Sequence, residues 1–452
     1  MHRRTLMAKS SRRKAQFLLF LAVAALNTPA LAAAEGLFSL TQYKLRNGLQ
    51  VILSVDPALP LVSVVVAYNV GSVDESPGKT GLAFLMKNLM FSSGSENVPP
   101  NQHINYIHRV GGRFNASASE DKTVFYETVP ATHLGLVLWL ESDRMKSLIP
   151  TETAFAQARM DHLDDLRGRR KDEPFLESFW SFDQLVYSDF AHSHPLAGSE
   201  DDVQALTLED AKGFYATYYV PNNAVICVAG SFDPLKAKEW IARYFETSPR
   251  GKDSGTSSEP FAPAKKQVVR TFEDATATAP AFCLGFSLGS PLSDDFSVLS
   301  LIDYILFRGR TSVLLRRLTN QRSSLMTPVR GVLEIRRDRV TYKIFVTANT
   351  VQNAEQYKDL IFAELAKLKT TLLNESEVGR FKALYKMDYL RVVASAEDRA
   401  LYLAGSYLNR IPVETLPLEL DRFLKITAID VVGILNRYFR AENSVVLNIK
   451  PK

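Results

Sequence analysis

Few side chains in this sequence stand at spacings that suit metal or nucleophilic chemistry. His162 lies three residues before Asp165, about one helical turn, so the two side chains could share a cation. They supply only two ligands, whereas protein zinc sites use three or four, and a solvated helix face is the simpler interpretation. The other closely spaced histidines do not form a ligand set: His103 with His108, and His192 with His194. No Cys-x-x-Cys, Gly-x-Ser-x-Gly, P-loop or dinucleotide-binding glycine pattern occurs.

The most informative stretch is residues 71–91, which read GSVDESPGKTGLAFLMKNLMF. It resembles the signature of the insulinase/pitrilysin zinc peptidases, a family that includes the mitochondrial processing peptidase. In that signature a GS…E…GxxGLA lead-in runs into HxxEH. The two histidines bind zinc from one helix face, and the glutamate is the general base toward a zinc-bound water. Here the three HxxEH positions are Phe84, Lys87 and Asn88.

None of these three side chains suits the chemistry of the family. Phe84 cannot ligate a metal, and Asn88 offers an amide oxygen that suits zinc poorly. Lys87 cannot act as a carboxylate base and would repel a cation. The resemblance places the third zinc ligand of the family, a glutamate on a later helix, at Asp165, whose shorter side chain reaches less far. The resemblance therefore implies that these positions are degenerate, and we expect no catalytic residues and no bound zinc.

A second match covers residues 111–119, GGRFNASAS, followed by Asp121 and Thr123. It resembles the GGxxNAxTxxDxT segment of the same family, an edge strand that pairs with the substrate backbone in active members. The resemblance implies that Asn115, Ala116 and Ser117 form a substrate-binding platform, which does not depend on zinc. The alternative interpretation is a glycine turn followed by ordinary edge residues.

The resemblance covers residues 39–250 well, and it includes an HPxxG loop at residues 194–198. It is looser beyond residue 309. There, active complexes take an Arg and a Tyr to hold the substrate carbonyl. The roughly equivalent positions in this chain are Val313, Thr319, Asn320 and Met326. The resemblance therefore implies that this second part of the site has also lost its substrate-holding Arg and Tyr.

Hydrophobic periodicity predicts the elements that must position these residues. A 3.6-residue period predicts helices over residues 80–91 and 153–170, and β-branched alternation predicts strands over residues 62–68 and 123–129. Similar elements recur after residue 280. We expect an α+β fold with two homologous metallopeptidase-like domains (LuxS/MPP-like), each with a mainly antiparallel sheet covered by helices.

The predicted domain order begins with a signal peptide at residues 1–34. An N-terminal peptidase-like domain (37–248), a linker rich in Gly, Ser and Pro (249–265) and a C-terminal peptidase-like domain (266–452) follow. The leader has a basic start, an apolar run at residues 17–25 and a small-x-small site ending at Ala32, so we expect cleavage and export to a bacterial periplasm. An uncleaved membrane anchor is the alternative.

Charge and cysteine content limit the remaining functions. The net charge of +5 comes mostly from the leader, so the mature chain is nearly neutral and no nucleic-acid partner is expected. No transmembrane segment is expected in the mature chain. Cys227 and Cys283 each lie in an apolar run, and both a disulfide and two buried free thiols are consistent with this.

These observations favour an exported, non-catalytic family member that pairs with an active, zinc-bearing homologue as a substrate-docking or scaffold subunit. A homodimer would also supply a partner. A zinc endopeptidase with a displaced metal site and a non-catalytic binder of extended peptides are the alternatives.

Overall fold

The computed structural model describes residues 37–253, 266–319 and 329–452. The predicted signal peptide, most of the predicted linker, and Asn320 and Met326 lie outside these ranges. In the described part of the chain, no helix combines the length and the apolar character needed to cross a membrane.

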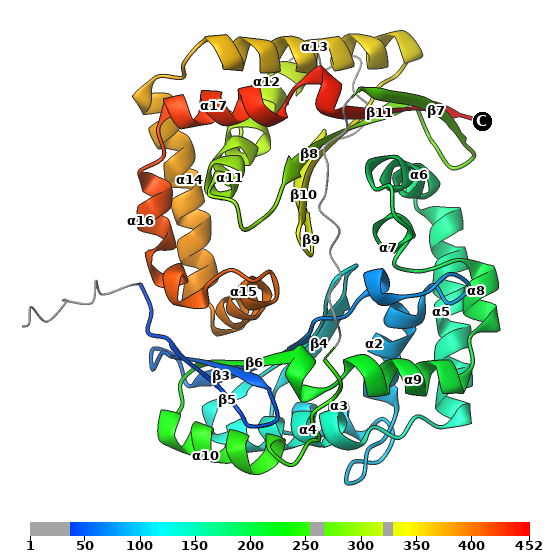
Figure 1. Ribbon diagram of the computed structural model, residues 1–452, viewed down its shortest axis with the longest axis vertical. Helices are drawn as coiled ribbons and strands as arrows, with labels where there is room; N and C mark the ends of the chain where they lie inside the picture. Colours follow the sequence, from blue (N-terminus) through cyan, green and yellow to red (C-terminus); the bar gives the residue numbers. More distant parts are fainter. Residues whose placement is uncertain (1–36, 254–265, 320–328) are drawn as a thin grey trace, which may run out of the picture. The chain divides into compact units, whose positions relative to one another are not determined.

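The first sheet has six strands in the order β1-β2-β6-β3-β5-β4 (Figure 1). Its strands are β1 (Thr41–Lys44), β2 (Gln50–Val55), β3 (Leu61–Tyr68), β4 (Arg113–Ala118), β5 (Thr123–Pro130) and β6 (Ala224–Gly230). Every neighbouring pair is antiparallel except β2 with β6. Strand β4 pairs only with β5, so it forms one edge of the sheet.

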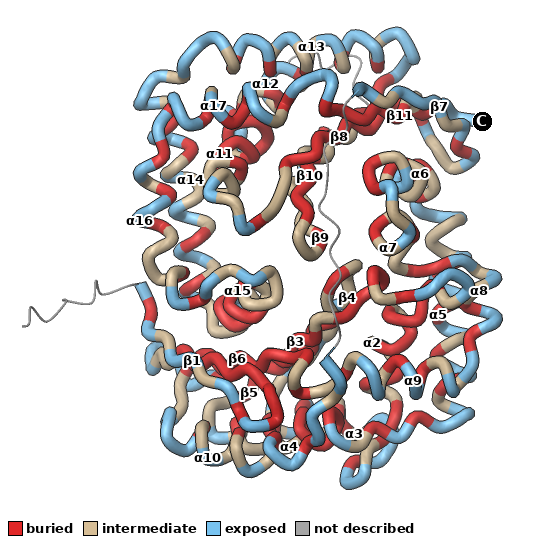
Figure 2. The backbone as a smooth tube through the Cα atoms, in the orientation of Figure 1, coloured by how far each residue is buried: buried red, intermediate tan, exposed pale blue. Residues whose placement is uncertain are grey.

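Helices cover one face of this sheet, and the core lies between them (Figure 2). The helices of the first half are α2 (Leu82–Ser92), α3 (Gln102–Arg109), α4 (Leu134–Ser147), α5 (Glu152–Asp172), α6 (Leu176–Val186), α7 (Phe190–Ser193), α8 (Glu200–Ala205), α9 (Leu208–Tyr218) and α10 (Pro234–Phe245). Helix α9 begins after a polar capping residue, because the Thr207 side chain accepts a hydrogen bond from the Asp210 N–H.

The second sheet has five strands in the order β7-β11-β8-β10-β9. Its strands are β7 (Val268–Asp274), β8 (Ala281–Gly289), β9 (Arg330–Arg336), β10 (Arg339–Thr347) and β11 (Ser444–Pro451). Only β7 with β11 is parallel. This order repeats that of the first sheet from β2 to β4. The α+β fold with two related, mainly antiparallel sheets is therefore confirmed.

The helices of the second half are α11 (Asp295–Phe307), α12 (Val313–Thr319), α13 (Val351–Thr370), α14 (Glu375–Ala394), α15 (Ala396–Leu408), α16 (Glu419–Leu424) and α17 (Ala428–Tyr438). Most helices of the second half pack on the β8 and β10 side chains of the second core, and α15 is the exception.

Each sheet is covered on its second face by a helix from the other half of the chain. Helix α15 packs on β3 and β6, where Val65 and Cys227 point away from the first core. Helix α6 packs on the second sheet, where Phe182 meets the face that carries Cys283. Burial on both faces explains why these strands are continuous apolar runs. It also shows that the two cysteines are free and buried on different sheets.

Candidate functional site

Helix α2 carries the three HxxEH positions, and buried hydrogen bonds hold its first turn. Gly81 precedes the helix with φ of 87°, a conformation that favours glycine. The buried Glu75 carboxylate accepts hydrogen bonds from the N–H of Gly81 (2.9 Å) and Ala83 (2.7 Å). It also contacts His194 Nε2 at 3.0 Å. The lead-in and the HPxxG loop, which is His194–Pro–Leu–Ala–Gly198, therefore meet at the start of α2.

Glu75 and His194 form an ion pair, and burial and hydrogen bonding shift the pKa of each residue in opposite directions. Burial raises the pKa of Glu75, and the hydrogen bond from His194 offsets part of this rise. Burial works against protonation of His194, but its hydrogen bonds with Glu75 and with the Phe190 carbonyl raise its pKa on balance. The pair is positioned to cap α2 rather than to bind a metal.

The side chains at the degenerate positions come together with α5. The rings of Phe84 and His162 lie 4.6 Å apart between centroids. Lys87 Nζ lies 4.1 Å from the centre of the Phe84 ring. Burial lowers the pKa of Lys87, and the negative charge of Asp165 opposes this shift. Phe84, Lys87, His162 and Asp165 therefore belong to one cluster between α2 and α5.

This cluster does not fit zinc. A phenyl ring and an ammonium group stand where the motif needs a ligand and a carboxylate base. Burial lowers the pKa of His162 to about 4, so the ring is neutral, and its Nε2 is 2.9 Å from the Ala197 carbonyl oxygen. Asp165 is exposed on α5. The hydrogen bond at Asn88 uses its backbone carbonyl, which accepts from Ser92 Oγ.

The predicted platform lies on the open edge strand β4. Asn115 and Ser117 are exposed and Ala116 is half-buried. The Ala116 N–H donates to Asn115 Oδ1 at 2.8 Å, which indicates that this N–H points away from β5. Strand β4 therefore has an outward backbone donor that is occupied by a local side chain rather than by another strand.

Strand β4 runs alongside α2 in the opposite direction (Figure 1). Near the C-terminal end of α2, Phe91 packs on Phe114 with ring centroids 5.0 Å apart. Before the helix begins, the Val73 N–H donates to the Glu120 carbonyl just beyond β4, at 2.8 Å. The edge strand β4 is therefore a neighbour of the helix that carries the HxxEH positions.

The β9–β10 turn of the second half also reaches this region. Arg337 Nη2 contacts both oxygens of Asp74, at 3.0 and 2.9 Å, and its N–H donates to Asp121 Oδ2 at 2.7 Å. Asp74 precedes α2, and Asp121 follows β4. Val313 and Thr319 lie instead on α12, which packs against α11 and α13.

Comparison with known proteins connects this geometry to a family. The family model described as "Insulinase (Peptidase family M16)" matches residues 50–165, and the one described as "Peptidase M16 inactive domain" matches residues 205–385. The chain belongs to the M16 peptidase family. It is similar to the "Zinc protease PqqE" of Helicobacter pylori, with 27% identity over 417 residues that cover 90% of this chain and 92% of that protein.

Solved structures agree with the M16 assignment. A protease from Helicobacter pylori superposes with a TM-score of 0.86 at 25% identity, covering 92% of this chain and all of that one. An M16 inactive-domain protein from Pseudomonas fluorescens superposes with a TM-score of 0.81 at 17% identity, covering 92% and 98%. The latter likeness concerns the fold alone.

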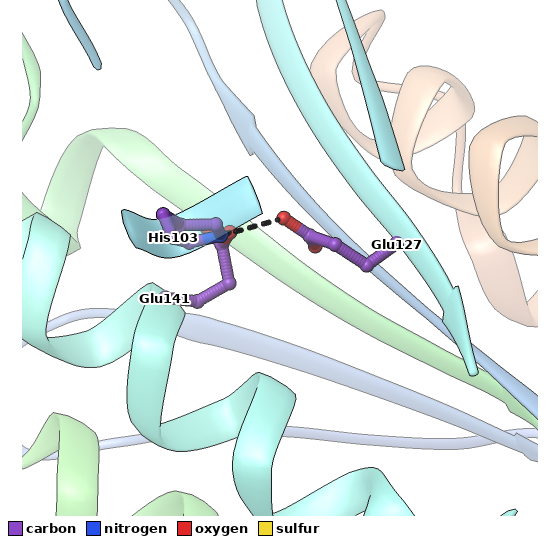
Figure 3. Close-up of side chains that lie close together, drawn as sticks. All are labelled: His103, Glu127 and Glu141. Atoms are coloured by element: carbon purple, nitrogen blue, oxygen red, sulfur yellow. Dashed lines mark hydrogen bonds and ion pairs between the residues drawn. The ribbon is translucent and has the colours of Figure 1, made fainter. Parts of the chain in front are cut away.

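The M16 signature did not point to a second polar cluster, which lies in the first core between α3, β5 and α4 (Figure 3). His103 Nε2 lies 3.2 Å from Glu127 Oε1 and 3.5 Å from Glu141 Oε1. The Arg144 guanidinium pairs with Glu141 and lies between the rings of Phe91 and Phe125. All four polar side chains are buried. These side chains lie on three elements that are separate in the sequence: α3, β5 and α4. No local sequence pattern therefore predicts that they meet.

Charge balance explains this cluster without a metal. Burial raises the pKa of Glu141 to about 8 even though Arg144 favours its anion, and Glu127 adds to the rise. The protonated Glu141 carboxyl donates a hydrogen bond to the Glu127 carboxylate, whose pKa is also raised by burial. Burial lowers the pKa of His103 to about 3, with help from Arg144. One arginine cation, one carboxylate, one carboxylic acid and one neutral imidazole leave no net charge in the core.

Proposed function

We propose that this chain is a non-catalytic M16 protein that docks extended peptides along β4 and serves an active homologue as a docking or scaffold subunit. The observation that carries the proposal is the position of Lys87. Its ammonium group lies over the Phe84 ring, within the electrostatic influence of Asp165, where the motif calls for a zinc site.

Support for docking comes from the open edge of β4. A strand edge with outward backbone groups can accept an extended peptide as an added strand, and this needs no metal. The Asn115 side chain covers one of these groups in the free protein, and a peptide carbonyl can replace it at the Ala116 N–H.

Metal content and peptide cleavage test the loss of catalysis. We expect the purified mature protein to contain no stoichiometric zinc and to leave unstructured peptides intact. One tightly bound zinc per chain, lost together with peptidase activity on chelation, would favour the displaced-site endopeptidase. His162 and Asp165 would then be the first residues to substitute.

Peptide docking has its own test, because two substitutions on β4 should act in opposite directions. Ala116→Pro removes the outward N–H while leaving the groups that face β5, so it should abolish binding of a fluorescent extended peptide. Asn115→Ala uncovers the same N–H and should preserve or strengthen binding. Equal affinity of both variants would argue against pairing along β4.

Partnering and export are further parts of the proposal. A non-catalytic docking subunit requires a catalytic homologue for any hydrolysis, and the leader sequence supports export to a periplasm. Co-purification from the native host followed by sizing tests the first. A strictly monomeric protein without a co-purifying homologue would contradict it. Mass spectrometry of the native N-terminus tests the second, and retention of Met1 would contradict it.

A further inference from the structure

Lys87 has an ammonium group without a polar partner. Its Nζ contacts the Phe84 ring, but no described residue accepts a hydrogen bond from it or forms an ion pair with it. Asp165 acts on it from a longer distance. An ammonium group has three donors, and a half-buried one loses solvation without gaining protein acceptors. The site therefore suits an anionic oxygen supplied by a ligand.

The position of Lys87 relative to β4 follows from the packing at Phe91. Lys87 precedes Phe91 by four residues, so the two side chains lie on the same helix face. Four helical residues rise about 6 Å along the axis, which corresponds to about two residues of a strand. Since Phe91 packs on Phe114 and the two elements run in opposite directions, this spacing places Lys87 at about the level of Ala116. This is the residue with the outward N–H.

We infer that Lys87 binds a carboxylate of a peptide that lies along β4, and that this chain prefers peptides that present a carboxylate at this position. The inference rests on the docking proposed above. The carboxylate belongs either to an Asp or Glu side chain or to a peptide C-terminus, since both present the same oxygens to an ammonium group. In the M16 motif this position is a glutamate, so the lysine reverses the charge that a docked peptide meets.

Nearby charges fit this selectivity. His162 is neutral at physiological pH, because burial holds its pKa near 4. Arg113 at the start of β4 is engaged with Glu397, at 3.0 Å. Glu75 is paired with His194. Of Lys87, His162, Arg113 and His194, Lys87 alone carries a cation for which the described residues supply no ion-pair partner.

Fluorescence anisotropy with labelled peptides of about eight residues tests the inference, because that length spans the six residues of β4 with a margin. One peptide pair differs by Glu or Gln at the centre, with an amidated C-terminus. A second pair has neutral side chains and differs by a free or amidated C-terminus. We expect the wild-type protein to prefer the carboxylate member of one pair about tenfold at low ionic strength, with a smaller preference in added salt. The pair that shows the preference identifies the source of the carboxylate.

Lys87→Met keeps the apolar stem and should abolish the preference, while Lys87→Glu should reverse it. Lys236→Met removes an exposed lysine of α10 and should leave the preference unchanged. Binding of all peptides without preference, or a preference that survives Lys87→Met, would overturn the carboxylate inference and leave docking intact. Failure of every peptide to bind the wild-type protein would overturn the docking proposal and this inference with it.

Discussion

Replacement of Glu141 by glutamine should change how the stability of the first half depends on pH. In the folded chain, Glu141 keeps its proton up to a pKa of about 8, whereas an ordinary glutamate has a pKa of 4.5. Between these values the unfolded chain releases a proton that the folded chain retains. Wild-type stability therefore falls as pH rises through this window. Glutamine imitates the neutral acid and does not titrate, so the variant lacks this fall.

The size of this stability difference follows from the raised pKa of Glu141. Each pH unit in the window is worth about 1.4 kcal/mol per proton, so the stability of Glu141→Gln relative to wild type should rise by about 3–4 kcal/mol between pH 5 and pH 8. Two of the three tryptophans, Trp139 and Trp240, pack against the first core, so their fluorescence during urea unfolding reports on the part of the chain that contains the cluster. The difference corresponds to more than about 1 M in urea midpoint.

A matched control is Glu96→Gln, which changes an exposed glutamate of the same half. It should give a pH profile parallel to that of the wild type. If the stability of Glu141→Gln also changed with pH in parallel with the wild type, the raised pKa of Glu141 would be refuted. Glu141 would then titrate normally in the folded chain.

Two substitutions and one labelling experiment test other buried contacts. Arg144→Met leaves a buried carboxylate unpaired and should cost about 3–5 kcal/mol in urea unfolding at pH 7; a loss below about 1 kcal/mol would contradict the charge balance described for the cluster. Burial raises the pKa of both Cys227 and Cys283, so neither thiol should react with a disulfide reagent at pH 8 in the native protein, and both should react after unfolding. Rapid native labelling would contradict this. Arg337→Ala removes the contact with Asp74 and should speed hydrogen exchange in residues 71–81, with Arg46→Ala as an unrelated control; unchanged exchange would show that the β9–β10 turn does not stabilise the lead-in.

Local patterns predicted much of the secondary structure. The predicted helix over residues 80–91 is Leu82–Ser92, the one over 153–170 is Glu152–Asp172, and the strand over 62–68 is Leu61–Tyr68. These elements have a strong apolar period, because side chains on one face of a helix or strand recur at a fixed spacing along the sequence. The sequence did not predict the short helices α7 and α8, because four to six residues are too few for an apolar period to distinguish a helix from a loop.

The sequence by itself determined the chemical types at the candidate site. Phenylalanine, lysine and asparagine at positions 84, 87 and 88 lack the ligands and base of the M16 motif in any conformation. The glycines and the helical period were enough to place these residues on one helix after a tight turn.

Only the tertiary structure decided which distant groups meet. It brought His162 onto the Phe84 ring and assembled His103, Glu127, Glu141 and Arg144 in one core. It also left Lys87 without a polar partner among the residues that the structure describes. It also covered each sheet with a helix from the other half. Such contacts depend on how whole elements pack, and a periodic pattern states which face of an element is buried but not which partner buries it.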